Sequence, residues 1–222
     1  MVESLNAALR PRLSRRPLLL VLGLGACAEM RQAPPLLPIS ALTSNTADPI
    51  RGAMQAMTPA LADQGRGLAG RPAEAAQAAA QLEFVTAAIP RDSRYAAVPD
   101  SVRRDFLLAR TELRDALGVA EDAAPEPVVR ALVTAAQALR RGDAARAAAA
   151  LPAPMFRPGG ERSVQRLGEL GPLPQCAIAS ANLTQVVARL DATGGWPGGK
   201  PSETNANIGS TFGFGADTSV GY

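Results

Sequence analysis

The chain has 222 residues and a mass of 22.9 kDa, which is long enough for one ordinary domain with a buried core. Hydrophobic residues make up 47%, charged residues 19% and aromatic residues 4%, a composition that excludes collagen-like, highly charged disordered and disulfide-scaffold classes. Histidine is absent. Mechanisms that use imidazole as a base, an acid or a metal ligand are therefore excluded.

The formal net charge of +3 belongs to the first 26 residues. Four arginines there face a single acid, Glu3, whereas residues 27–222 contain 19 basic and 19 acidic side chains. A basic surface that binds nucleic acid needs an excess of positive charge in the folded part of the chain. The sequence therefore predicts no nucleic-acid partner.

The N-terminal residues follow the order of an export signal. Arginines between positions 10 and 16 form a positive region, residues 17–24 form a short apolar run, and Gly25 and Ala26 are small. The apolar run is shorter than the ~20 residues that span a bilayer. Leu24-Gly25-Ala26-Cys27 resembles the lipobox of bacterial lipoproteins. In that class the cysteine thiol receives diacylglycerol, the peptide is cut just before the cysteine, and the new amine is acylated. The resemblance implies a signal peptide over residues 1–26 and lipidation of Cys27.

The lipobox also implies a location. Several acyl chains anchor a protein stably, so we expect a soluble domain held on the periplasmic side of the cell envelope, with the lipid bilayer as its partner through acylated Cys27. Ala28 is not the aspartate that retains some lipoproteins in the inner membrane, which favours the outer membrane. The segment Ser14-Arg15-Arg16-Pro17-Leu18-Leu19 also resembles a twin-arginine signal, so general secretory and twin-arginine export both stay open.

Two segments predict extended or flexible chain. Residues 27–47 contain Pro34, Pro35 and Pro38, and proline fixes φ and removes hydrogen-bond donors. We expect this segment to be a lipidated tether. Residues 191–222 contain eight glycines and four charged side chains, too little apolar surface to offset the backbone entropy lost on folding. We expect a glycine-rich, disordered tail.

Residues 48–190 repeat apolar positions at helical spacing. Caps, prolines and glycines divide them into helices that begin at Asp48-Pro49, run over 72–90, 100–118 and 125–142, follow Asp143 as far as Pro152, and span 178–190. Pro59 is expected to kink or shorten the first helix. No stretch alternates with a period of two for long. The sequence therefore predicts an all-α antiparallel helical bundle.

Three groups of residues are candidates for chemistry. Glu112 and Asp115 share a helix face and could form the carboxylate pair of a glycan-cleaving enzyme, although neighbouring arginines favour a solvated face. Cys176 lies beside apolar residues without a basic neighbour, which favours a small buried side chain over a reactive thiol. Residues 194–200 have the spacing of a phosphate-binding loop, but Pro201 supplies neither hydroxyl nor backbone N–H. We assign no catalytic, cofactor-binding or metal-binding residue and expect no cofactor.

Residues 136–146 resemble part of a tetratricopeptide-type helix pair. They cover less than one repeat and have no copies in register, so a plain helical hairpin is the better interpretation. The resemblance would imply a protein-binding surface.

These observations predict a membrane-anchored envelope lipoprotein whose helical domain is a non-enzymatic binding or structural module, with an envelope protein as its further partner. The alternatives are an envelope enzyme that uses the carboxylate pair and a carrier of apolar ligands that uses a crevice between helices. Acids converging in a deep pocket would favour the enzyme, and an enclosed apolar cavity would favour the carrier. An open apolar groove would favour the binding module.

Overall fold

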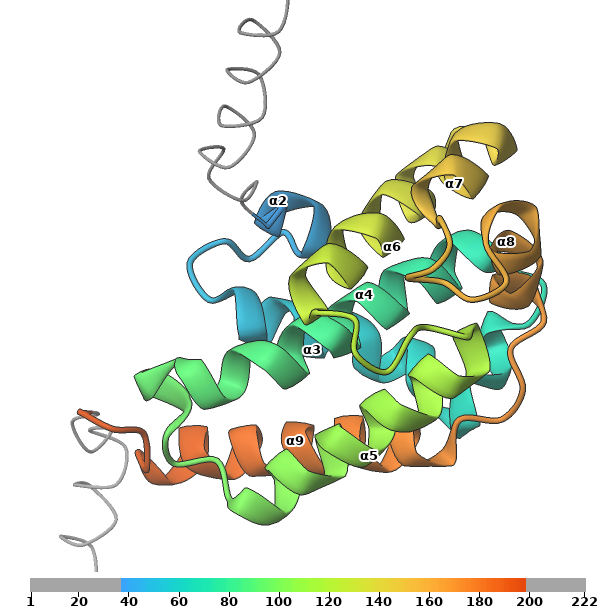
Figure 1. Cartoon of the computed structure of the whole chain (residues 1–222). Helices are drawn as coiled ribbons and strands as arrows, with labels where there is room; N and C mark the ends of the chain where they lie inside the picture. The colour runs from blue at the N-terminus through green and yellow to red at the C-terminus, as the bar shows by residue number, and fades with distance from the viewer. Residues whose placement is uncertain (1–36, 199–222) are drawn as a thin grey trace, which may run out of the picture. The chain divides into compact units, whose positions relative to one another are not determined.

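A computed structural model describes residues 37–198 (Figure 1). Its α-helices are α2 (Ile39–Leu42), α3 (Pro49–Leu61), α4 (Pro72–Ala88), α5 (Asp100–Leu117), α6 (Pro125–Arg140), α7 (Ala144–Ala150), α8 (Gly160–Gly168) and α9 (Pro174–Thr193). Short 3-10 turns, η1 (Asp63–Leu68), η2 (Ile89–Arg91) and η3 (Ser93–Tyr95), join some of them. The described residues contain no strand, only one isolated bridge between Val119 and Phe156. The predicted all-α fold is confirmed.

Helix α4 is the central element, and α3, α5, α6 and α8 pack against it (Figure 1). The sequence predicted one apolar stripe on this helix, but residues 78–86 are buried without interruption. A helix that is buried on all sides belongs to the middle of a domain. Alanines occupy much of α4, and their small side chains allow neighbouring helices to approach closely.

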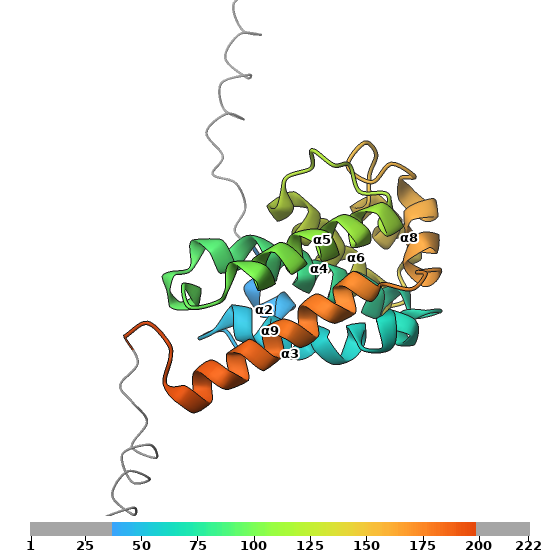
Figure 2. The ribbon, with the colours of Figure 1, turned by 90° about the horizontal axis from the view of Figure 1, so that it is seen from below.

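Helix α9 lies between α3 and α5 in the view from below (Figure 2). Asn182 donates a hydrogen bond to Asp105 of α5. The backbone N–H of Gln175 donates to Glu112, which lies seven residues further along α5. Residue numbers therefore rise along one helix as they fall along the other, which makes the pair antiparallel as predicted.

Residues 37–47, predicted to belong to the tether, pack on the helices. Leu42 is only 1% exposed, and its carbonyl accepts a hydrogen bond of 2.8 Å from the Gln81 side chain on α4. Gly52 of α3 allows this approach, since a Cβ atom there would lie 2.0 Å from the hydroxyl oxygen of Thr43. The folded domain thus starts before Asp48. The predicted signal peptide, the lipidation site Cys27 and tether residues 27–36 lie outside the described residues.

The C-terminal boundary also differs from the prediction. Helix α9 continues to Thr193 and ends at Gly194, which has the left-handed conformation that commonly terminates helices. Trp196 then packs against the core. Residues 191–198 are therefore part of the fold, whereas the sequence predicts a flexible tail from residue 191. The rest of that predicted tail lies outside the described residues.

Two helices differ from those that the sequence predicts. Helix α3 continues through Pro59 to Leu61, and Pro59 is exposed in its last turn. Helix α8 was not predicted, since only Ser163 and Leu167 of its residues are buried and two positions make no recognisable repeat. No helix among residues 37–198 is long and apolar enough to cross a membrane.

Candidate functional site: an apolar groove

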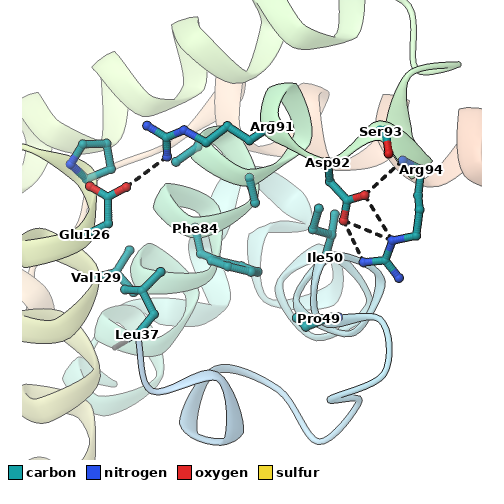
Figure 3. Close-up of a pocket in the computed structure, with 13 residues that line it drawn as sticks. Leu37, Pro49, Ile50, Phe84, Arg91, Asp92, Ser93, Arg94, Glu126 and Val129 are labelled. Atoms are coloured by element: carbon teal, nitrogen blue, oxygen red, sulfur yellow. Dashed lines mark hydrogen bonds and ion pairs between the residues drawn. The ribbon is translucent and has the colours of Figure 1, made fainter. Parts of the chain in front are cut away.

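A groove of about 450 Å³ opens between the start of α3, the end of α4 and the start of α6 (Figure 3). We name it the apolar groove. Its apolar lining residues are Leu37, Pro49, Ile50, Phe84, Ala87, Ala88, Pro125 and Val129. Phe84 comes from the central helix, so the groove lies directly against the core of the domain.

Local sequence places the elements around the groove. Pro125 occupies the first position of α6, where a missing N–H removes no helical hydrogen bond. Helix α4 gives way to η2 at Ile89-Pro90, and the chain turns back through η3. The Asp92 carboxylate accepts a hydrogen bond from the backbone N–H of Arg94 and fixes this turn.

Two ion pairs stand at the rim of the groove (Figure 3). Arg91 Nη1 lies 2.9 Å from Glu126 Oε1, and Arg94 Nη2 lies 2.7 Å from Asp92 Oδ2. Hydrogen bonding from the Arg94 side chain lowers the pKa of Asp92. The arginine side chains are 67% and 53% exposed, whereas Glu126 and Asp92 are 39% and 24% exposed. The rim therefore presents its positive charges more fully to a partner than its negative ones.

The groove is open to solvent, and its acids belong to separate ion pairs. It can accept apolar side chains on its floor and carboxylates at its rim. Helical periodicity did not predict this site, because its lining comes from segments that are far apart along the chain. The sequence feature that could have indicated the groove is the pair Pro90 and Pro125. These prolines mark the end of α4 and the start of α6, which lie together because the two helices are antiparallel.

The two acids of the candidate carboxylate pair, Glu112 and Asp115, lie in different environments. Glu112 accepts hydrogen bonds from the backbone N–H groups of Gln175 and Cys176, at 3.2 and 3.0 Å. These donors lie in the first turn of α9, where backbone N–H groups lack helical partners. Asp115 is exposed and faces the arginines of another part of the surface. Glu112 therefore holds α9 in place, whereas Asp115 lies on the solvated face that the sequence predicts.

Cys176 is completely buried. Its thiol donates a hydrogen bond to the carbonyl of Ala109 at 3.3 Å. Burial, followed by the nearby Glu112 carboxylate, raises the pKa of the thiol. The structure thus agrees with the interpretation of Cys176 as a small buried side chain.

The glycine-rich stretch begins at the end of a helix. Gly194 caps α9, whereas a phosphate-binding loop follows a strand. Trp196 donates a hydrogen bond of 2.7 Å to Asp191, which also forms an ion pair of 2.7 Å with Arg51 of α3. Described residues of the stretch therefore fasten α9 to α3, and Lys200 and Pro201 lie outside the described residues.

No group of three or more His, Cys, Asp or Glu side chains within residues 37–198 is arranged to hold a metal ion. Comparisons with protein-family models, with curated proteins and with solved structures find no match to this chain.

Proposed function

We propose that this protein is an envelope lipoprotein, anchored through acylated Cys27, whose helical domain binds an envelope protein in the apolar groove. The groove is the observation that carries the proposal. It is an apolar surface that is open to solvent, and such a surface suits the side chains of a protein segment, whereas a small apolar ligand is usually held in an enclosed cavity. The outer membrane is the favoured location, on the sequence of the lipobox and Ala28.

The partner's chemistry follows from the lining. The groove has room for two or three apolar side chains from one short segment, which would contact Phe84, Ile50 and Val129. Arg91 and Arg94 are paired with Glu126 and Asp92 but are more exposed than these two acids, so the rim suits acidic residues that flank this segment. Charge complementarity of this kind sets orientation and association rate more than affinity. The proposed occupant is therefore an apolar protein segment with acidic flanks.

Photo-crosslinking in intact cells tests the groove. A benzophenone amino acid replaces Ala88, which lines the groove, in the full-length chain. The matched control carries the same group at Ala149, which is exposed on α7 outside the groove. We expect a discrete protein adduct from position 88 that is absent from position 149. Ala87→Arg, which places a charge in the groove, should abolish the adduct.

Two outcomes would contradict the proposed partner. Identical adducts from positions 88 and 149 would mean that the groove is not the contact surface. Lipid adducts without a protein adduct would favour the carrier of apolar ligands instead.

The anchor has its own test. Labelled palmitate should enter the wild-type chain and fail to enter Cys27→Ser, while Cys176→Ser retains the label. A wild-type chain that is cleaved yet unlabelled would overturn the lipoprotein assignment.

A further inference from the structure

Two hollows of about 470 and 440 Å³ adjoin one another beside α5, α8 and the loop that precedes α8. Both are lined by Asp115 and Arg157. We call the combined feature the arginine site. The arginines that define it are Arg110 on α5, Arg157 in the loop, and Arg162 and Arg166 on α8.

The arginine site carries an excess of positive charge. None of its four arginines takes part in an ion pair between described residues. Two carboxylates, Asp115 and Glu121, line the hollows, which leaves an excess of two positive charges. Arg114 also lines one hollow, but its charge is neutralised by Glu83 in the core.

The backbone around the site is held in place. The N–H of Arg157 donates to the Gly118 carbonyl at 2.7 Å, and the N–H of Ala120 donates to the Met155 carbonyl at 2.8 Å. These bonds join the loop after α5 to the loop before α8. An anion bound here would meet walls that are already ordered, which reduces the entropy lost on binding.

Gly118 brings Arg166 close to the end of α5. Its φ of +70° is the left-handed conformation that glycine adopts without strain. A Cβ atom at this position would lie 2.9 Å from Arg166 Nη1 and 2.9 Å from Pro158 Cδ. The guanidinium of Arg166 therefore occupies space that only glycine leaves free.

We propose that the arginine site binds a phosphomonoester. Such a group carries a charge of about −1.5 to −2 at pH 7, which matches the excess of two positive charges. Guanidinium groups also bind phosphate oxygens through paired N–H donors. Each hollow has the volume of more than about ten water molecules, so it accommodates the alcohol part as well as the phosphate. The site is independent of the apolar groove.

The phosphate could belong to a soluble ester or to a lipid headgroup, and both sources are testable. The full-length chain in detergent micelles is titrated by phosphorus NMR with glucose 1-phosphate, and separately with micelles containing phosphatidic acid. Phosphatidylglycerol is the comparison lipid, because its phosphodiester carries one charge. We expect at least one phosphomonoester to bind, with an affinity about tenfold or more above that of phosphatidylglycerol.

Matched variants locate the binding. Arg162→Gln with Arg166→Gln should lower the affinity at least about tenfold, because charge-assisted hydrogen bonds are lost. The control, Arg141→Gln with Arg146→Gln, removes the same charge from exposed positions outside the hollows and should stay within about twofold. Circular dichroism verifies the fold of both variants, and Arg157→Gln is the second test if the α8 variant unfolds.

Binding of either phosphomonoester that depends on these arginines upholds the site. The compound that binds shows whether the phosphate comes from a soluble ester or from a lipid headgroup. Three results would overturn the proposal: no binding of either phosphomonoester, equal affinity for phosphatidylglycerol, or an equal loss of affinity in the control variant.

Discussion

Glu83 on α4 and Arg114 on α5 form an ion pair inside the domain, with side chains that are 1% and 11% exposed. Arg114 Nη2 lies 3.0 Å from a Glu83 carboxylate oxygen. Arg114 Nη1 donates to the carbonyls of Glu121 and Ala123 at 3.2 and 3.0 Å. One guanidinium thus joins the central helix to the loop between α5 and α6.

Arg114→Met should destabilise the domain by about 3–5 kcal/mol, because it leaves the Glu83 carboxylate buried without a partner. Glu83→Leu combined with Arg114→Met should recover part of this loss, since both charges are then gone. Urea unfolding measures both effects, and Arg110→Met on the same helix is the control. A double variant less stable than Arg114→Met alone would contradict this account.

Glu112→Ala should lower the free energy of unfolding by about 1–2 kcal/mol, because the first turn of α9 loses its acceptor. The residue before α9, Leu173, supplies no side-chain cap. Asp115→Ala should change it by less than about 0.5 kcal/mol, as exposed charges do. Thermal denaturation compares the two variants. Equal effects would show that Glu112 does not hold α9.

Trp196 fluorescence should report the titration of Asp191. Hydrogen bonding from Arg51 lowers the pKa of Asp191 below its ordinary value of 3.8. Because the folded-state pKa is the lower one, this stabilisation is complete above the unfolded value and is lost as the pH falls through the folded value. Trp196 is the single tryptophan of the chain, so its emission should shift to the red in that range. Asp191→Asn should remove this step, and an unchanged titration would contradict the assignment.

Cys176 should resist thiol reagents in the folded protein. The variant Cys27→Ser leaves Cys176 as the single thiol of the chain. Burial and a raised pKa both oppose formation of the reactive thiolate. We expect stoichiometric labelling in denaturant and at least about a hundredfold slower labelling in native buffer at pH 8. Rapid native labelling would mean that α9 opens or that the thiol is accessible.

Helical periodicity predicted the main helices, because each has a cap or proline at its start and apolar residues at a spacing of three and four. On α5, for example, Phe106 and Leu113 lie seven residues apart, at a helical spacing, and both are buried. The same periodicity could not predict α2, since its four residues make one turn. It also could not predict that Gly52 admits Thr43, which depends on the distance between two segments.

The candidate sites depend on contacts between distant residues, and spacing along the chain does not encode such contacts. Glu112 and Asp115 look equivalent on a helical projection, yet only Glu112 contacts the beginning of α9. Arg157 and Arg166 gave no signal in the sequence, because the hollows form only when α8 folds back beside α5. Composition also concealed the arginine site, since its charge is balanced by acids elsewhere in the domain.

Helix α9 is fastened at its beginning by Glu112 and near its end by the Arg51–Asp191 pair, so the last described helix closes on one of the first. The ribosome synthesises the chain from its N-terminus. Helix α3 therefore emerges about 120 residues before α9, the helix that covers it. The domain therefore cannot complete its fold during most of its own synthesis. Until α9 is made, the apolar faces of α3 and α5 are available to chaperones, and a ribosome that stalls before residue 174 yields a chain that exposes both.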